Sequence, residues 1–540
     1  MAVITLSKEK VKNIIGNKND DEIDNLLSLF GAGVENIDND NINVEIAANR
    51  ADLLSETLFM KSLGNFYGNK KIKEYKLKKG KENYKIKINS NLKNIRPFTA
   101  CSVVLGLELD EDKIKDIVNI QEKLHNTLCR NRKKAAIGIY PLDKIKMPIK
   151  YEARGSKEIK FIPLGENHDM DAHDILTKTD KGREYSSLLE KHEKFPVFVD
   201  SNGKIMSMPP IINSDEIGKI TAETRDVFVE CSGFDIEFLK KILNIVSCCL
   251  EEMGGSVYSV ELDYGEYKIS TPDFKMKKIS LDLENVKKLL GIKINEKDIK
   301  KLFERMDLIY ENGQVLIPPY RLDISHENDL IEDIAIAYGY DKFEPTLGNI
   351  NHFGERSLKS KNDDKIRDIL IGLGFLETNT YHLIRKEDTE ILKSECYELE
   401  NAKTEYKLLR NNLLIPFLKI FSENKDNEYP QKIFEIGSVF KKDKKNKICE
   451  EDKLIIAFSP SNFTSMKQIL DYLFRLLGLE YGIEEGNEKG LVEGRTGKII
   501  FRNNEIGYIG EVHPQTLKGF GIKMPVGIVE ISLERILQNC

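Results

Sequence analysis

The sequence is short of the residues and patterns that mark several classes of protein. It has no tryptophan, and its eight cysteines show neither CxxC spacing nor the regular spacing of a disulfide framework, so we expect reduced thiols in a cytoplasmic protein. Its eight histidines form no HxH or HExxH pair, which argues against a zinc site. No apolar run is long enough to span a bilayer, so we expect no membrane association. The net charge of −6 confines any nucleic-acid contact to local patches.

The length and the order of strand and helix patterns predict an α+β multidomain protein. A chain of 540 residues has room for several cores, and 40% hydrophobic with 31% charged residues is ordinary globular composition. We expect an N-terminal α/β domain at 1–85, a larger unit at 90–265, a third domain at 270–345 and a mixed antiparallel domain at 355–540. Two helices, a hairpin turning at Asn312-Gly313 and a further helix give the third domain a winged-helix-like pattern.

A lysine-rich tract at 69–90 lies near the first predicted boundary. Tyr84, Ile86 and Ile88 alternate with polar residues there, which predicts a strand. Such a basic stripe would suit contacts with phosphate, but lysines also protect exposed edge strands from aggregation. We favour the solvated edge strand.

An acidic helix within 317–343 is the most unusual element of the chain. Ser325 is a potential N-cap and Gly339 a potential end, and the apolar residues of the helix recur at helical spacing. Carboxylates on a separate face repel one another unless a positive charge lies among them. A hard cation such as Mg2+ and a solvated face paired with lysines both satisfy the pattern. The acidic residues are Asp323, Asp329, Glu332 and Asp333.

The order of these residues resembles a known family. Arg321-x-Asp323-Ile324, Asp329-Leu330-x-Glu332-Asp333 and Tyr338-Gly339-Tyr340-Asp341 are similar to the beta subunit of phenylalanyl-tRNA synthetase, in its archaeal and eukaryotic cytosolic branch. The resemblance implies that the four acidic residues bind a structural Mg2+ at the boundary with the alpha subunit, which favours the cation over the solvated face. The resemblance extends over nearly the whole chain.

Residues 90–265 resemble the tRNA-editing domain of that family, which hydrolyses tyrosine wrongly attached to tRNA(Phe). The similarity rests on Glu122-Lys123-Leu124-His125, Arg130 to Lys134, Ala136-Ile137-Gly138 and Ser207 to Asn213. Ester hydrolysis needs a positioned water, donors for the oxyanion and a pocket selective for the phenol. The resemblance implies an editing pocket formed by Ser207, Lys219, Glu230 and Ser232.

The geometry of a strand supports part of this pocket, and the sequence departs from the family pattern in places. Glu230 and Ser232 stand at i and i+2, so they face the same side of a strand. They replace the aspartate and threonine of archaeal relatives, and Tyr140-Pro141 replaces a usual histidine and aspartate. The alternative is that these are ordinary buried polar residues with satisfied partners.

Residues 355–540 resemble a class II synthetase catalytic module that has lost its active site. A class II site needs one arginine on the ATP α-phosphate and a glycine-rich segment that ends in a second. Arg502 lacks the Arg-x-Glu context, and the segment around Gly507 and Gly510 continues without an arginine. We therefore expect no adenylation site in this chain, with ATP bound by the alpha subunit.

The resemblance implies a beta subunit in an (αβ)2 heterotetramer that attaches phenylalanine to tRNA(Phe). This chain would supply the surface for the alpha subunit, contacts to tRNA and the editing site. Two other interpretations remain: a free-standing proofreading hydrolase, and a nucleic-acid-binding scaffold without chemistry. A catalytic-like module that lacks an active site favours the partnered subunit over both alternatives. The acidic helix argues against DNA binding, because it would repel phosphate.

Overall fold

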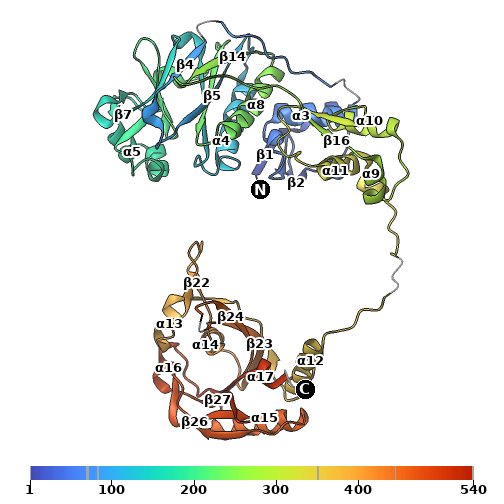
Figure 1. The fold of residues 1–540 in the computed structure, drawn as a ribbon, viewed down its shortest axis with the longest axis vertical. Coiled ribbons are helices and arrows are strands. Elements are labelled where there is room, and N and C mark those ends of the chain that lie inside the picture. Colours follow the sequence, from blue (N-terminus) through green and yellow to red (C-terminus); the bar gives the residue numbers. More distant parts are fainter. Residues whose placement is uncertain (1, 69–71, 82–83, 349–351, 444, 538–540) are drawn as a thin grey trace. The chain divides into compact units, whose positions relative to one another are not determined.

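The computed structural model describes residues 2–68, 72–81, 84–348, 352–443 and 445–537. The chain divides into two compact units, Met1–Thr346 and Leu347–Cys540, each with its own sheets and core (Figure 1). The mixed α/β multidomain class predicted from the sequence is confirmed. Within the described residues, no helix is both long and apolar enough to cross a membrane.

Two parts of the first unit share one arrangement: a strand, two helices, a hairpin and a further helix. The N-terminal copy consists of β1 (Ala2–Ser7), α1 (Lys8–Ile15), α2 (Asp20–Phe30), β2 (Gly33–Ile37), β3 (Asn41–Ile46) and α3 (Glu56–Gly68). The later copy consists of β16 (Lys277–Ser280), α9 (Leu283–Leu290), α10 (Glu296–Arg305), β17 (Ile309–Glu311), β18 (Gln314–Ile317) and α11 (Glu327–Tyr338). Their three-stranded sheets have the matching orders β1-β3-β2 and β16-β18-β17. The helices and hairpin expected at 270–345 are present, and β16 was missed.

The acidic helix α11 begins one residue later than predicted. His326 rather than Ser325 is the N-cap, and its ring nitrogen accepts a hydrogen bond from the Asn328 amide. The Asp329 carboxylate accepts from the amides of Ser325 and His326, which completes a capping box. The helix ends at Gly339, whose φ of 104° suits glycine.

The larger part of the first unit is built on a ten-stranded sheet of order β12-β11-β10-β7-β4-β14-β5-β13-β6, with β15 also paired to β14. The helices α4 (Glu111–Asn126) and α8 (Ile236–Glu252) pack on this sheet. The strands are β4 (Lys85–Ile88), β5 (Phe98–Leu105), β6 (Ala135–Pro141), β7 (Ile149–Gly155), β10 (Lys194–Val199), β11 (Ile205–Met208), β12 (Ile212–Asn213), β13 (Val227–Gly233), β14 (Ser256–Asp263) and β15 (Lys268–Thr271).

The end of the lysine tract is an interior strand, so the predicted edge strand is wrong. β4 pairs in parallel with both β7 and β14. These partners are distant in sequence, and a local pattern of lysines cannot reveal them. Lys70 and Lys71 of the tract lie outside the described residues.

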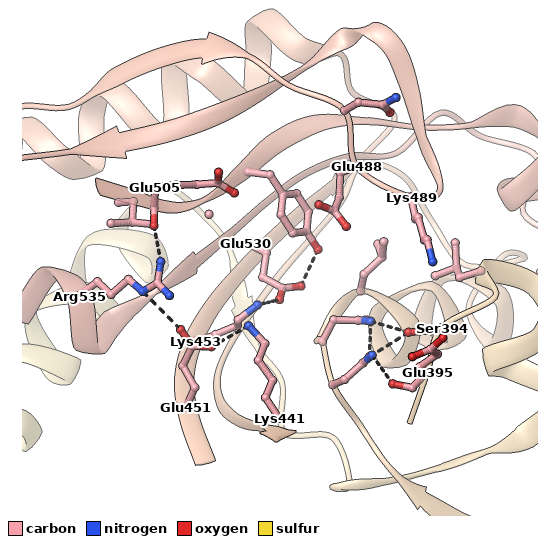
Figure 2. A pocket seen from close by; sticks show the side chains of 18 residues that line it. Ser394, Glu395, Lys441, Glu451, Lys453, Glu488, Lys489, Glu505, Glu530 and Arg535 are labelled. Carbon is pink, nitrogen blue, oxygen red and sulfur yellow. Dashed lines mark hydrogen bonds and ion pairs between the residues drawn. The ribbon is translucent and has the colours of Figure 1, made fainter. Parts of the chain in front are cut away.

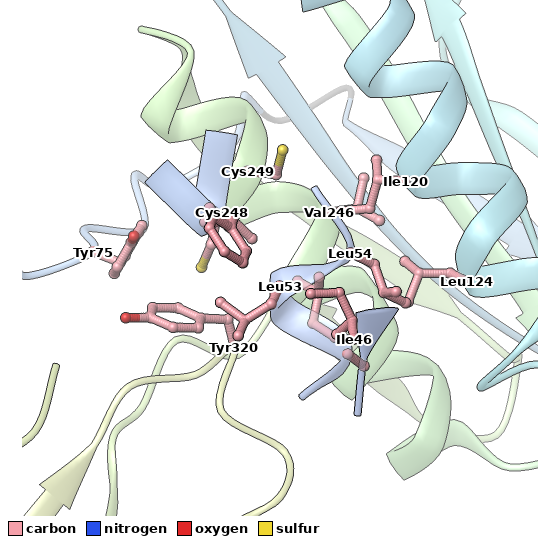
Figure 3. Packing of buried hydrophobic residues seen from close by; sticks show 14 of the residues in the cluster. Ile46, Leu53, Leu54, Tyr75, Ile120, Leu124, Val246, Cys248, Cys249 and Tyr320 are labelled. Carbon is pink, nitrogen blue, oxygen red and sulfur yellow. The ribbon is translucent and has the colours of Figure 1, made fainter. Parts of the chain in front are cut away.

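One hydrophobic core joins the parts of the first unit. Figure 3 shows Leu54 beside Leu124 of α4, and Val246 of α8, Cys248 and Tyr320 belong to the same core. Full burial of each such side chain contributes about 1.5–3 kcal/mol. The described cysteines are all free thiols, as the sequence predicts.

The second unit is a seven-stranded, mostly antiparallel sheet of order β19-β23-β24-β28-β27-β26-β25. Along β24, Leu454 and Ile456 face α12 and α15, whereas Ile455 and Ala457 face α14. The predicted helix from Leu408 begins only at Leu414, after a short strand. The elements are α12 (Leu358–Gly372), β19 (Leu376–Glu377), β20 (Leu383–Arg385), α13 (Lys386–Leu392), β21 (Tyr397–Glu398), β22 (Tyr406–Leu409), α14 (Leu414–Glu423), β23 (Gln431–Lys442), β24 (Ile448–Ser459), α15 (Phe463–Leu476), β25 (Gly482–Glu485), β26 (Leu491–Phe501), β27 (Asn504–Val512), α16 (Pro514–Gly519), β28 (Gly527–Ser532) and α17 (Leu533–Leu537).

Candidate functional site

A cavity of about 280 Å³ lies in the large domain of the first unit. Its lining combines the C-terminal turns of α4, the loop that follows, the start of β6, the β11–β12 segment and the middle of β13. Alternation along β13 explains why a carboxylate reaches it: Val229 and Cys231 pack into the core under α4 and α8, so Glu230 faces the other side of the sheet.

The loop after α4 holds an arginine against this cavity. Arg130, Asn131 and Arg132 have φ values of 52°, 52° and 62°, a left-handed run that non-glycine residues rarely adopt. The Arg132 guanidinium donates to the Ile211 carbonyl at 2.8 Å and to Glu122 Oε1 at 2.9 Å. These bonds leave the Arg132 Nε without a hydrogen-bond partner.

Three buried polar atoms of the cavity lining lack a hydrogen-bond partner, namely His125 Nδ1, Arg132 Nε and Glu230 Oε2. Nearly all buried polar groups in proteins are paired, so three such atoms around one cavity indicate a site shaped for a polar ligand. His125 Nε2 accepts from the Ile137 amide at 2.8 Å, which places the proton of the neutral ring on Nδ1. That N–H lies 3.5 Å from Glu122 Oε1.

The two carboxyl groups of the cavity have opposite electrostatic environments. The nearby His125 N–H, 3.5 Å away, and the charge of Arg132 lower the pKa of Glu122 to about 2 despite partial burial. Burial raises the pKa of Glu230 to about 8, although Arg96 opposes the shift. At neutral pH the site therefore holds one carboxylate and one carboxylic acid, a division of roles used in acid–base catalysis.

Of the four residues predicted for the editing pocket, Glu230 is the one that lines this cavity. Ser207 is buried, and its hydroxyl accepts a hydrogen bond from Tyr140 at 2.9 Å. Ser232 is buried too and accepts from Arg96 Nε at 3.2 Å, whereas Lys219 is exposed just after the short helix α7 (Asp215–Gly218).

Sequence reasoning did not assign Glu122, His125, Arg132 or Asn213 to the site, although all four line the cavity. The spacing of Glu122 and His125 at i and i+3 near the end of a helix was an available signal, because it puts both on one face. The contribution of Asn213 depends on strand pairing that the sequence does not display.

The four acidic residues predicted to bind Mg2+ do not converge. Arg321 binds Asp323 through two hydrogen bonds of 2.8 and 2.9 Å and Asp333 through one of 2.7 Å. Asp329 caps its own helix, and Glu332 is exposed. In the described parts of the chain, no three His, Cys, Asp or Glu side chains are placed to hold a metal ion.

These carboxylates therefore do not fit a magnesium site within this chain, because the Arg321 guanidinium already supplies the positive charge that they need. The magnesium assignment stays a prediction of the resemblance.

A second cavity, of about 690 Å³, lies in the second unit (Figure 2). Glu530 is completely buried there and pairs with Lys453 at 2.5 Å, while the Tyr508 hydroxyl donates to it at 2.8 Å. Arg535 of α17, an arginine outside the glycine-rich segment, lies at this cavity and contacts Glu451. Both oxygens of the buried Glu530 carboxylate already have partners. Unlike Glu230 in the first cavity, Glu530 therefore has no unpaired oxygen with which to bind a ligand.

Family models match three stretches of the chain. The models describe a B3/4 domain at residues 107–242, a tRNA synthetase B5 domain at 279–340 and a phenylalanyl tRNA synthetase beta chain CLM domain at 345–533.

Relatives match over most of their length. The phenylalanine–tRNA ligase beta subunit of Pyrococcus horikoshii is 37% identical over 507 residues, which cover 91% of this chain and 90% of that protein. The beta subunit of Archaeoglobus fulgidus is 33% identical over 546 residues, covering 99% and 98%. The crystal structure of an N-terminal fragment of the Pyrococcus horikoshii beta subunit superposes with a TM-score of 0.59 at 34% identity, over 62% of this chain and 99% of that one.

A mixed α/β chain that carries these three domains in this order is a component of an aminoacyl-tRNA synthetase. The chain belongs to the family of phenylalanine–tRNA ligase beta subunits, as its resemblance predicts. It is thus part of a ligase, membership implies an alpha-subunit partner, and the family generally uses Mg2+.

Proposed function

We propose that this chain assembles with an alpha subunit into an (αβ)2 heterotetramer in the cytoplasm. The complex attaches phenylalanine to tRNA(Phe), with ATP bound by the alpha subunit, and this chain contacts the tRNA. The Archaeoglobus fulgidus beta subunit, of which the match covers 98%, supports this assembly over a free-standing hydrolase or a scaffold. Native mass of the co-expressed chains tests it: a stable monomer of this chain that needs no alpha subunit would contradict it.

We also propose that the 280 Å³ cavity is a proofreading site that hydrolyses the ester of tyrosine wrongly attached to tRNA(Phe). The single observation that carries this proposal is that three residues lining one cavity, His125, Arg132 and Glu230, each have a buried polar atom without a hydrogen-bond partner. Unpaired donors that the fold already holds in position can stabilise the negative charge that develops during a reaction.

The groups of the cavity suit the two halves of ester hydrolysis. Glu122, which stays ionised but is a weak base at this low pKa, orients a water for attack on the ester carbonyl carbon by accepting a hydrogen bond from it. The N–H groups of His125 and Arg132 donate to the oxyanion. The bond between the carbonyl carbon and the ribose oxygen then breaks, the proton that the attacking water loses passes to the ribose oxygen, and free amino acid and uncharged tRNA result.

Replacement of Glu122 by glutamine tests the site. In the complex with the alpha subunit, we expect Glu122→Gln to slow deacylation of tyrosyl-tRNA(Phe) by roughly 10²-fold, because the carboxylate that orients the attacking water is lost. Phenylalanine charging should be unchanged. Glu237→Gln is a matched control, since this exposed glutamate of α8 pairs with Lys240 alone. Equal deacylation by both variants would reject the proposed site.

The finer magnesium proposal has its own test. Glu332 is the one of the four acidic residues that is exposed, so Glu332→Gln leaves the Arg321 pairs intact. If the four residues bind Mg2+ in the assembled complex, this variant should lower the metal content of the purified complex. An unchanged metal content would reject the assignment.

A further inference from the structure

The hydroxyl of one tyrosine of the chain lies within hydrogen-bond distance of two residues that line the proposed editing site, Asn213 and Glu230. The hydroxyl oxygen of Tyr140, on β6, lies 2.9 Å from Ser207 Oγ, 3.2 Å from Asn213 Oδ1 and 3.3 Å from Glu230 Oε1, and its single proton bonds one of these oxygens at a time. The side chain is completely buried, and its ring stacks on Phe228 with centroids 6.1 Å apart. A phenol therefore already occupies the hydrogen-bonding cluster that the sequence predicts for the phenol of a tyrosyl substrate.

The sheet register makes this arrangement possible. Gly138 and Tyr140 lie on the same face of β6, and β13 places Glu230 opposite Gly138. A Cβ on Gly138 would collide with the Tyr140 hydroxyl and approach Glu230 Oε1 to 2.7 Å. The absence of a side chain at Gly138 thus makes room for the phenol to lie back along its own strand and reach the carboxyl group.

The protonation of the cluster agrees with an internal hydrogen-bond network. Burial raises the pKa of Tyr140 well above its usual value, as it does for Glu230, so both groups keep their protons at neutral pH. The single Tyr140 proton is then available to Ser207, its nearest acceptor. The cavity wall includes Glu230 and Asn213, whereas Ser207 is not part of that lining.

We propose that Tyr140 determines the specificity of the editing site, because its hydroxyl takes the hydrogen bonds of Ser207 and Glu230 that would otherwise recognise a tyrosyl substrate. This inference rests on the proposed hydrolysis. A site with unpaired groups for a substrate hydroxyl rejects the analogue that lacks it by up to about 10⁴–10⁵-fold. When those groups are satisfied internally, tyrosine gains little over phenylalanine, and the native site hydrolyses tyrosyl-tRNA slowly.

The test measures deacylation of tyrosyl- and phenylalanyl-tRNA(Phe) by the complex with the alpha subunit. Tyr140→Ala removes the ring and opens the cluster to the substrate, and Tyr140→Phe frees the acceptors while it keeps the packing. We expect tyrosyl-tRNA hydrolysis to rise by about 10–200-fold in the alanine variant and by less in the phenylalanine variant, with phenylalanyl-tRNA hydrolysis little changed. Tyr264→Phe is the matched control, because that hydroxyl bonds only the Thr99 backbone.

The outcomes separate this inference from the proposed function. If the Tyr140→Phe variant, with phenylalanine charging intact, hydrolyses tyrosyl-tRNA no faster than the native complex while Glu122→Gln abolishes hydrolysis, the role of Tyr140 is wrong and the editing site stands. If neither the native complex nor any variant hydrolyses either tRNA, the proposed function fails and this inference fails with it.

Discussion

Replacing Glu230 with glutamine should remove a pH-dependent loss of stability from the native chain. Below pH 4.5 the carboxyl group holds its proton in the folded and the unfolded chain alike, so it costs nothing. As the pH rises, the unfolded chain releases the proton but the buried group keeps it until its folded pKa of about 8. Stability is therefore lost across this window, and a glutamine, neutral in both states, loses none.

The pKa values set the size of this effect. One pKa unit corresponds to about 1.4 kcal/mol, so the interval from 4.5 to about 8 corresponds to roughly 5 kcal/mol of unfolding free energy. We expect Glu230→Gln to match the native chain near pH 4 and to exceed it by up to about 5 kcal/mol above pH 8. Glutamine can still accept the Tyr140 hydrogen bond, so packing is retained.

Hydrogen exchange of the β6 and β13 amides is the appropriate assay, because it reports on this domain and not on the second unit. Native and variant chains are compared at the same pH, which cancels the intrinsic pH dependence of exchange. Glu237→Gln serves as an exposed control. If native and Glu230→Gln chains lose protection equally between pH 5 and pH 8, the carboxyl group is not held neutral and the reasoning is refuted.

Three further substitutions test the buried contacts. Arg321→Ala leaves Asp333 buried without its partner and should destabilise the first unit by about 3–5 kcal/mol in urea unfolding; a loss below 1 kcal/mol would contradict the pairing. Lys453→Met leaves Glu530 buried without its charged partner. It should lower the urea midpoint of the second unit and leave that of the first unit unchanged. Gly138→Ala introduces a methyl group into an occupied space, which should cost about 1–3 kcal/mol and weaken deacylation; full stability and activity would show that the space is open.

The sequence predicted correctly those elements whose structure depends on residues close together in the chain. The hairpin at Asn312-Gly313 follows from two residues that accept positive φ, and the structure gives them 50° and 77°. The acidic helix is present with one N-cap residue shifted, because Asp329 satisfies the amide of Ser325 and thereby moves the cap to His326. The period-two rule put Glu230 and Ser232 on one face of a strand, and both lie in β13 at alternate positions to the core residues Val229 and Cys231.

Contacts between residues that are distant in the sequence determined the features that these local patterns could not predict. The strand β4 carries lysines typical of an edge, but two distant strands enclose it. The charge of the acidic cluster pointed to a cation, and the partner found in this chain is Arg321, whose distance in space from Asp333 the sequence cannot state. The duplicated arrangement of β1 to α3 and β16 to α11 was likewise visible only in the matching sheet orders.

The sequence by itself determined the family of this protein, because the charged positions of its acidic helix and its editing-domain motifs recur in an order that chance does not produce. Only the tertiary structure showed which side chains share a cavity. Glu122 of α4, Asn213 of β12 and Glu230 of β13 line one cavity, although β12 and β13 are not neighbours in the sheet. The register of β6 against β13 places Glu230 opposite Gly138, and so brings Tyr140, a simple departure from a pattern, within hydrogen-bond distance of Glu230, because a hydrogen bond depends on distance in space and not on separation in sequence.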